Sequence, residues 1–337
     1  MKLARFSKKM KLLSLGAATL LAAGVFAGCG SDQSVSTSSG KTYKVGIVQL
    51  VEHNALDAAN KGFVDGLKER GFEEGKNITF DKQNAQADQS NLQNIAQRFV
   101  SGKMDLICAI ATPAAQTVAN ATKDIPIVGT AITDYVGAKL AASNDKPGAN
   151  VTGTSDMNPI KEQIDLLLKI KPDAKTIGVI YCSSEVNSEV QVKAMQEYAE
   201  SKGLAVKVAT ISTVNDIQQA AQSLVGSVDA FYEPTDNVIA SAMPTLVAIT
   251  DAAKLPIICG EPNMVKAGGL ATYGIDYYKL GVQTGHMAAD ILEGKSKPAD
   301  MSIERAKDLK ITVNKADAAR LGITIPEDVL KDADLVD

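Results

Sequence analysis

One polar loop of the chain combines a hydroxyl group, a proline and free amides at the start of a helical pattern. In IATPAAQT, Thr112 and Pro113 follow the apolar run DLICAI, where a strand would end and a helix begin. Proline suits the first helical turn because its missing N–H would have no partner there. The N–H groups of Ala114 and Ala115, with the Thr112 hydroxyl, can bind an anion that the helix dipole stabilises. The absence of lysine and of a glycine-rich motif favours a carboxylate, and the alternative is a plain helix cap by Thr112.

A second polar loop, in the later half of the chain, carries an acid at the start of a helical pattern. In EPTDNV, Asp236 and Asn237 follow the strand-like run VDAFY. A carboxylate at this place could bind an ammonium group. The alternative is helix capping by Asp236 or Asn237, because both side chains accept hydrogen bonds from the first N–H groups of a helix.

Other candidates stand where ligands of open parallel sheets bind, beyond the carboxyl ends of the strands. His53 lies in the loop after the first strand and is either a ligand contact or a solvated loop residue. Asp134, Glu261 and Asp276 are acids at strand ends or crossovers, and we expect at most two acids to contact a ligand. The complete set of predicted ligand-binding residues is Thr112, Pro113, Ala114, Ala115, Thr130, Asp134, Asn187, Ser188, Asp236, Asn237, Glu261, Asp276, His53 and Leu56.

The sequence lacks the motifs of common catalytic sites. It has no G-x-S-x-G, no phosphate-binding G-x-x-x-x-G-K-[ST], no H-E-x-x-H and no G-x-G-x-x-G after the first strand. Two histidines and four separated cysteines leave little material for a zinc site. We therefore expect no enzyme, no metal and no cofactor. Cys108, Cys182 and Cys259 lie in apolar runs and are expected to be buried thiols without a disulfide.

The length and net charge of the chain limit the class of protein and its partners. The chain has 337 residues, 45% of them apolar and 22% charged, which is ordinary globular composition with room for two domains. The formal charge of -4 and the lack of a long basic run argue against a nucleic-acid partner, since phosphate binding needs a basic face.

From residue 43 the chain alternates strand-like and helical patterns twice. Strand-like runs that are mostly apolar, separated by helices, predict parallel sheets covered on both faces. In the first half the strands are expected at 43–50, 77–83, 105–110 and 125–130, with helices near 56–67, 92–100 and 114–122. In the second half the strands are expected at 176–181, 204–210, 228–234 and 255–261, with helices at 186–201, 217–225 and 238–252.

The two halves also correspond in sequence. The glycine of KVGIVQ matches that of TIGVIY, the aspartate of MDLICAI matches that of VDAFYEP, and the proline of DIPIVGT matches that of KLPIICG. The offsets are 132, 124 and 130 residues, and such near-constant spacing indicates two similar α/β lobes.

Three crossings between the lobes would place a cleft between them. The extended segments 150–156 and 269–276 are the first two crossings, and a helix at 278–293 precedes a further strand at 309–314. We expect an α/β fold of two Rossmann-like lobes with parallel sheets and three interlobe crossovers. The N-terminal lobe would comprise residues 42–155 plus 277–305, and the C-terminal lobe residues 156–276 plus 306–337.

The first residues have the pattern of a targeting segment. Five basic residues precede an uncharged, mostly apolar stretch at 12–27, which suits a signal peptide better than a membrane span. The stretch ends at Phe26-Ala27-Gly28-Cys29, which resembles a bacterial lipoprotein lipobox. We predict a lipoprotein signal peptide at 1–28, acylation of Cys29 with palmitate-type lipid, and a flexible Ser-rich tether at 29–41. The alternative is ordinary secretion, with Cys29 a chance residue.

Several segments together resemble the extracytoplasmic substrate-binding lipoproteins of ABC transporters. They include IVQLVEHNALDAANKGFVDGLKERGF, NAQADQSNLQNIAQ, ATPAAQTVANATKDIPIV, TDYVGAKL, NVTGTSD, EPTDNV and GIDYYKLGVQTGHMAADIL, and they span roughly residues 42–325. The resemblance is to the family known as uncharacterised ABC substrate-binding proteins, some of which bind aromatic amino acids such as tryptophan. It implies the type I periplasmic-binding-protein fold, an ABC permease as partner and a location outside the cytoplasm on a lipid anchor.

The resemblance also implies site residues where the motifs match. The family's T-P-A-A loop, which holds the ligand carboxylate, matches residues 112–115, its T-D-N loop matches 235–237, and its H-x-x-L-D loop matches 53–57. The chain departs from the family at Tyr135, where proline is frequent, and at Glu261. The function expected is binding of a small amino acid-like ligand by closure of two lobes for an importer, with an aromatic amino acid as one option. The alternatives are a ligand-sensing subunit of a membrane signalling system and a binder of another solute such as a sugar.

Overall fold

Six parallel strands form the first of two sheets in the computed structural model, which describes residues 41–307 and 309–337. The predicted signal peptide, Cys29 and the tether up to residue 40 lie outside the described residues. The strand order is β11-β5-β4-β3-β1-β2. The strands are β1 (Tyr43–Gln49), β2 (Ile78–Asn84), β3 (Leu106–Ile110), β4 (Ile127–Ile132), β5 (Val151–Ser155) and β11 (Glu304–Arg305).

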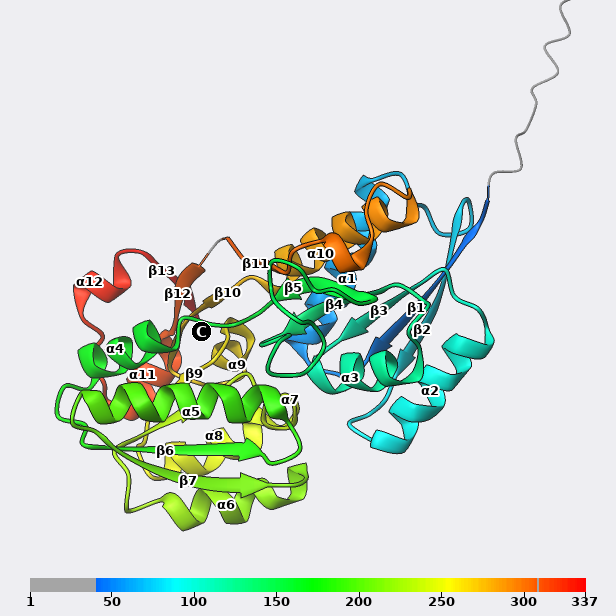
Figure 1. The fold of residues 1–337 in the computed structure, drawn as a ribbon. Helices are drawn as coiled ribbons and strands as arrows, with labels where there is room; N and C mark the ends of the chain where they lie inside the picture. The colour runs from blue at the N-terminus through cyan, green and yellow to red at the C-terminus, as the bar shows by residue number, and fades with distance from the viewer. Residues whose placement is uncertain (1–40, 308) are drawn as a thin grey trace, which may run out of the picture. The chain divides into compact units, whose positions relative to one another are not determined.

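Two pairs of helices cover this sheet, and together they form the N-terminal lobe (Figure 1). One pair is α1 (Asn54–Glu69) and α10 (Tyr277–Leu292), and the other is α2 (Gln89–Ser101) and α3 (Thr112–Ala121). Each helix turns an apolar stripe inward, because residues three and four apart share one face. Gly46 of β1 leaves room for the ring of Phe99 on α2, which would lie 2.8 Å from an added Cβ. A short 3-10 turn, Pro298–Asp300, follows α10.

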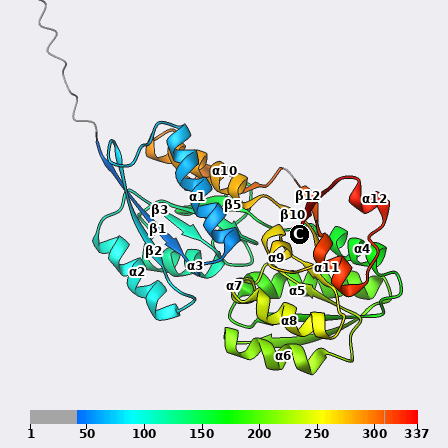
Figure 2. The same cartoon turned by 180° about the vertical axis from the view of Figure 1, so that it is seen from behind.

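The pair α1 and α10 packs backbone to backbone. Figure 2 shows the two helices side by side although more than 200 residues separate them in the sequence. The contact consists of glycines on both helices, Gly62 and Gly66 facing Gly281 and Gly285. A Cβ at Gly281 would lie 2.1 Å from the carbonyl oxygen of Ala59. This contact fixes α10 to the N-terminal lobe after the chain has passed through the other lobe.

The second sheet has seven strands in the order β13-β12-β10-β9-β8-β6-β7. Its strands are parallel, as predicted, except that β12 runs antiparallel to β10. The exception arises because the chain returns to β12 from the first sheet and not through a helix packed on the second. The strands are β6 (Thr176–Cys182), β7 (Ala205–Ile211), β8 (Ala230–Glu233), β9 (Ile257–Cys259), β10 (Ala271–Ile275), β12 (Leu309–Asn314) and β13 (Ala333–Val336).

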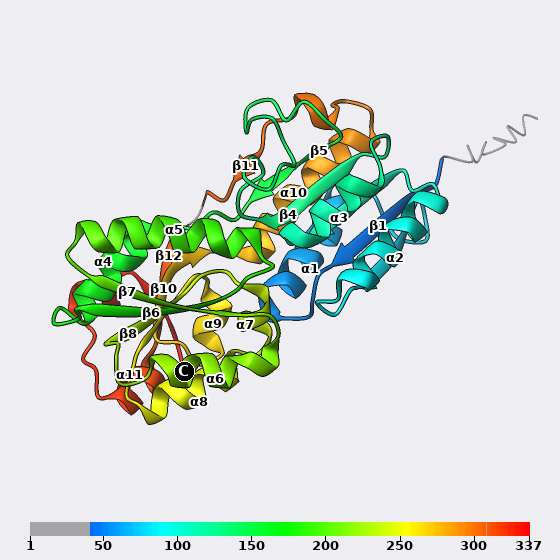
Figure 3. The same ribbon diagram turned by 60° about the horizontal axis from the view of Figure 1, so that its bottom comes forward.

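Helices lie on both faces of this sheet and complete the C-terminal lobe (Figure 3). On one face are α4 (Ile160–Ile170) and α5 (Val186–Ser201). The remaining helices are α6 (Ile217–Leu224), α7 (Asn237–Ser241), α8 (Met243–Ala252), α9 (Pro262–Lys266), α11 (Lys315–Leu321) and α12 (Glu327–Leu330), with a 3-10 turn at Val214–Asp216. The single helix predicted at 238–252 is wrong. It is broken at Ala242, because Pro244 cannot donate the hydrogen bond that a continuous helix needs.

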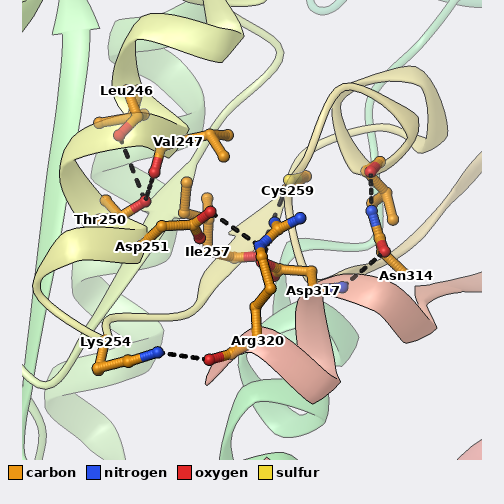
Figure 4. Close-up of polar contacts among 11 residues, drawn as sticks. Leu246, Val247, Thr250, Asp251, Lys254, Ile257, Cys259, Asn314, Asp317 and Arg320 are labelled. Atoms are coloured by element: carbon orange, nitrogen blue, oxygen red, sulfur yellow. Dashed lines mark hydrogen bonds and ion pairs between the residues drawn. The ribbon is translucent and has the colours of Figure 1, made fainter. Parts of the chain in front are cut away.

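Helix α11 is bound to α8 by an arginine between two acids. In Figure 4 the guanidinium of Arg320 reaches Asp251 at 2.9 Å and Asp317 at 2.7 Å. Lys254 adds a hydrogen bond to the carbonyl oxygen of Arg320 at 2.6 Å. The last elements of the chain therefore belong firmly to the C-terminal lobe.

These elements confirm the predicted α/β class, and the chain passes between the sheets three times, after β5, β10 and β11. Cys108, Cys182 and Cys259 are free, buried thiols. In the part of the chain that the structure describes, no helix is long and apolar enough to cross a lipid bilayer.

Candidate functional site

A narrow cavity lies where loops of the two lobes meet. Its walls come from the loops after β1 and β4, from the starts of α5, α7 and α9, and from two of the crossovers. The cavity contains about 290 Å³ that protein atoms do not fill. Only about 10 Å³ of this volume is accessible to the centre of a water molecule, so the cavity has room for about one water molecule. The lining residues are His53, Ala55, Leu56, Ala131, Thr133, Asp156, Asn187, Thr235, Asp236, Asn237, Ala240, Glu261 and Tyr277.

Polar side chains join the two lobes across this cavity. Nε2 of His53 lies 3.2 Å from Oδ1 of Asn237, and Gln191 donates to the Thr133 hydroxyl at 3.5 Å. The Asn237 amide nitrogen donates to Glu185 at 2.5 Å, so its oxygen faces His53. His53 must then present an N–H at Nε2. Burial lowers the pKa of His53, which favours the neutral ring.

On the C-terminal side of the cavity, carboxylates cap the helices. Asp236 accepts from the backbone N–H of Ile239 at 2.9 Å and from Cys182 N–H and the Ser188 hydroxyl, each at 2.7 Å. The alternative that Asp236 is a helix cap therefore describes its contacts in the structure. Glu261 caps α9 in the same way, through the N–H groups of Asn263 at 2.6 Å and Met264 at 2.8 Å.

On the N-terminal side the starts of α1 and α3 carry no such caps, whereas Asp276 caps α10. Among the described residues, no side chain caps α1 after His53 or α3 after Ala111. Ala111 has a φ of 83°, a left-handed conformation that alanine rarely adopts. The buried Thr112 hydroxyl has no hydrogen-bond partner in the described part of the chain, so it does not act as a cap. Of these two uncapped starts only that of α1 lines the cavity, so its free N–H groups face the carboxylates of the other side.

A buried aspartate in the first crossover was missed by the sequence reasoning. Asp156 lies just beyond β5 and is 4% exposed. Its Oδ1 accepts from the Thr133 hydroxyl at 2.9 Å and its Oδ2 from the Tyr277 hydroxyl at 2.7 Å. Burial raises the pKa of Asp156. The sequence predicts NVTGTSD only as an extended crossing between the lobes, and the acid directly after this Thr/Gly-rich strand is the signal that points to Asp156.

A second missed acid lies behind the cavity wall. Glu185 precedes α5 and accepts from Asn187, Asn237 and the N–H of Val238. Burial, reinforced by the charge of Asp236, raises the pKa of Glu185 to about 8. Burial likewise raises the pKa of Glu261 to about 7 and, with Asp236 nearby, that of Glu233 well above its ordinary value. Acid groups therefore dominate this wall.

The predicted site residues divide into two groups. The structure brings His53, Leu56, Asn187, Asp236, Asn237 and Glu261 to the cavity. The residues that do not line it are Thr112, Pro113, Ala114, Ala115, Thr130, Asp134, Ser188 and Asp276.

Short-range contacts explain why the two remaining acids stay away from the cavity. Asp134 accepts from the N–H groups of Val136 and Gly137 at 3.0 Å within its own turn, and Asp276 caps α10. Tyr135 is buried in the N-terminal lobe, where its hydroxyl donates to the carbonyl oxygens of Gly129 and Thr154.

Comparison with known proteins gives a consistent family. Residues 44–337 match the family model for ABC transporter substrate binding proteins. A tyrosine-binding protein of Clostridioides difficile is 46% identical over 314 residues, covering 91% of both chains. A crystal structure of an ABC domain from Streptococcus pneumonia in complex with L-Trp is 43% identical, with a TM-score of 0.85, covering 88% of this chain and 100% of that one.

The structure of a third relative was solved without ligand and in an open form. A ligand-free, open structure of a substrate-binding protein with adhesive properties from Clostridium difficile is 47% identical, with a TM-score of 0.68, covering 88% of this chain and 99% of that one. The fold shared with these structures is the type I periplasmic-binding-protein fold. Members of the family are solute-binding proteins and not enzymes, and they work outside the cytoplasm with ABC permeases. The chain belongs to the family of ABC transporter substrate-binding proteins.

Proposed function

We propose that this chain is the lipid-anchored solute receptor of an ABC importer and that it binds an aromatic amino acid as a zwitterion between its lobes. The observation that carries the proposal is the difference in polarity across the cavity. The uncapped start of α1 on the N-terminal lobe offers N–H donors to a carboxylate, and carboxyl groups on the C-terminal side offer acceptors to an ammonium group. The two relatives named for tyrosine and L-Trp support an aromatic side chain.

The helix starts of α1 and α3 are the donors proposed for the ligand carboxylate. Ala55 and Leu56, in the first turn of α1, line the cavity directly. On α3, which does not line the cavity in this structure, the unpartnered Thr112 hydroxyl supplies a further donor once the lobes move, whereas the N–H of Ala115 already donates to the carbonyl oxygen of Ala111 at 3.1 Å. In the described part of the chain, no lysine or arginine lines this cavity. Backbone N–H groups and hydroxyl groups must therefore bind the ligand carboxylate.

Opening and closing of the lobes would give the ligand access. The cavity has room for about one water molecule, so an amino acid can enter only if the lobes separate. The chain superposes better on the relative with bound L-Trp, at a TM-score of 0.85, than on the open, ligand-free relative, at 0.68, although the identities are 43% and 47%. This supports a closed arrangement here and an open one during exchange. The lobe boundaries at 155/156, 276/277 and 305/306 stay predictions, which the strand orders support.

Calorimetry of the purified protein tests the ligand class. We expect L-tyrosine or L-tryptophan to bind at micromolar concentrations, corresponding to about −8 kcal/mol, with galactose and leucine binding at least about 100-fold more weakly. An aromatic ligand should also raise the melting temperature, because it binds only the folded state. If no amino acid binds more tightly than about 1 mM while a sugar does, the zwitterion proposal is wrong.

The lipid anchor is tested separately, by fractionation of cells. Changing Cys29 to alanine should release the protein from the membrane fraction, because acylation of that sulfur supplies the proposed anchor. Ser31→Ala, two residues along the tether, is the matched control and should remain in the membrane fraction. Retention of the Cys29→Ala protein with membranes would contradict the anchor and leave the ligand proposal unaffected.

A further inference from the structure

We propose that Asp156 and Asn187 form the subsite for the ligand's ammonium group and that the cation enters this subsite in exchange for a proton. The inference rests on the proposed function, since it assumes a ligand with an ammonium group. It assigns that group to residues other than Asp236, the acid that the sequence favoured.

The first argument is the unused hydrogen-bonding capacity of the carboxyl groups around the cavity. An ionised carboxylate has about four acceptor positions. Asp236 and Glu261 each accept three hydrogen bonds from their own lobe, two of them from backbone N–H groups in each case. Asp156 accepts only two from other side chains, both from hydroxyl groups. Asp156 is therefore the cavity acid with the most capacity left for a ligand.

The second argument is a buried oxygen without a donor. Asn187 lines the same cavity and is 3% exposed. Its Nδ2 donates to Glu185 at 2.9 Å and to the carbonyl oxygen of Thr235 at 3.2 Å, which fixes the orientation of the amide. Its Oδ1 finds no partner in the described part of the protein. Such a group is costly to bury, and an ammonium group, with three N–H donors, would satisfy it together with Asp156.

The third argument is the charge balance of the cavity. The groups that face Asp156 or share its cavity are Tyr277 from α10, Thr133 after β4, His53 before α1, Asp236 before α7 and Glu261 before α9, with Tyr135 and Glu185 behind them. Lys266 acts on Glu261 from α9, but lysine and arginine do not line the cavity among the described residues. Buried carboxyl groups without a cation hold protons more tightly, and burial raises the pKa of Asp156 accordingly.

An ammonium group beside Asp156 reverses that preference. The incoming cation favours the carboxylate, so the proton of the Asp156 carboxyl group leaves for solvent and no other bond is made or broken. Ligand and proton therefore compete for the same carboxyl group. The affinity for a ligand with an ammonium group should fall as the pH falls through the raised pKa of Asp156.

Two probes that differ only in the amino group test the subsite. Calorimetry would measure the affinities of L-tyrosine and of 3-(4-hydroxyphenyl)propanoate, which has the same ring and carboxylate. We expect the wild-type protein to prefer L-tyrosine by at least about 100-fold and Asp156→Asn to reduce this ratio to about 10-fold or less. Asn187→Leu should reduce the ratio by about 5-fold to 10-fold. As the pH is lowered through the raised pKa of Asp156, the wild-type affinity for L-tyrosine should fall relative to the affinity for the analogue, and in Asp156→Asn this dependence should weaken.

Asp236→Asn is the matched control, because it changes a buried acid of the same cavity that acts as a helix cap. It should lower the affinity for L-tyrosine and the affinity for the analogue by similar factors, so that the ratio of the two affinities stays unchanged. If Asp156→Asn does not fold, Tyr277→Phe removes the hydroxyl that orients Asp156 and should lower the ratio by about 3-fold or more. A ratio that persists in Asp156→Asn, or that collapses only in Asp236→Asn, overturns the subsite. Failure of the wild-type protein to bind L-tyrosine and every other amino acid would instead overturn the proposed function.

Discussion

Replacing Gly281 by valine should lower the free energy of unfolding by at least about 3 kcal/mol. A Cβ at this position would lie 2.1 Å from the carbonyl oxygen of Ala59 and 2.9 Å from the amide nitrogen of Phe63. Both are backbone atoms of α1, so no side-chain rotation relieves the overlap and the two helices must separate. The separation would expose Phe63, which is fully buried in the N-terminal lobe. Urea unfolding followed by circular dichroism measures the loss.

Gln283→Val is the control for this substitution. Gln283 lies on the same helix α10 but is only partly buried. Valine there removes its exposed hydrogen bonds to Glu304 and to the carbonyl oxygen of Arg305, and it adds the lower helix propensity of a β-branched residue, about 0.5 kcal/mol. A Gly281→Val protein as stable as Gln283→Val would show that the α1–α10 contact is looser than the structure describes. Because α10 follows the second crossover directly, weakened packing should also reduce ligand affinity, whereas Gln283→Val should leave it intact.

The same contact shows how much of the fold could be predicted from the sequence. The apolar spacing predicted both helices within a few residues of their observed ends, since each needs only its own periodicity. The Gly-x-x-x-Gly pairs at 62–66 and 281–285 are visible in the sequence, but nothing local says that they face each other. Long-range pairing of this kind depends on the whole topology. The break at Ala242, in contrast, was predictable from Pro244 and was overlooked.

The sequence predicted where the candidate site lies better than it predicted what each residue does there. Acids and amides at strand ends were expected at the cleft, and Asp236, Asn237, Asn187 and Glu261 are there. The sequence could not show that the oxygens of Asp236 already accept from its own helix and from Cys182, because the latter bond joins residues 54 apart. Roles of this kind depend on which acceptors the fold has already used, and that is a property of tertiary structure.

The free energy of unfolding should fall as the pH rises from 5.5 to 8.5. Burial raises the pKa of three carboxyl groups in the folded protein, Glu185 to about 8, Glu261 to about 7 and Asp317, beside Asp251, to about 6. In the unfolded chain these groups titrate near 4, so the folded state binds more protons between about pH 4 and pH 8. Their stabilising contribution is complete below the unfolded pKa and is lost as the pH rises through each folded pKa. Each pH unit of this interval is worth up to about 1.4 kcal/mol for each group, which predicts a total loss of about 3 kcal/mol or more.

Urea titrations at pH 5.5, 7.0 and 8.5 measure this dependence, and two variants identify its source. His53 opposes the trend, because its lowered pKa destabilises the folded protein as the pH falls below about 6.5, but it is a single group. Glu185→Gln should remove most of the loss between pH 7 and pH 8.5, since the pKa of Glu185, about 8, is the highest of the three. Asp317→Asn, in the cluster of Figure 4, should flatten only the part near pH 6. Stability that rises steadily from pH 5.5 to pH 8.5 would mean that these carboxyl groups are ionised in the folded protein.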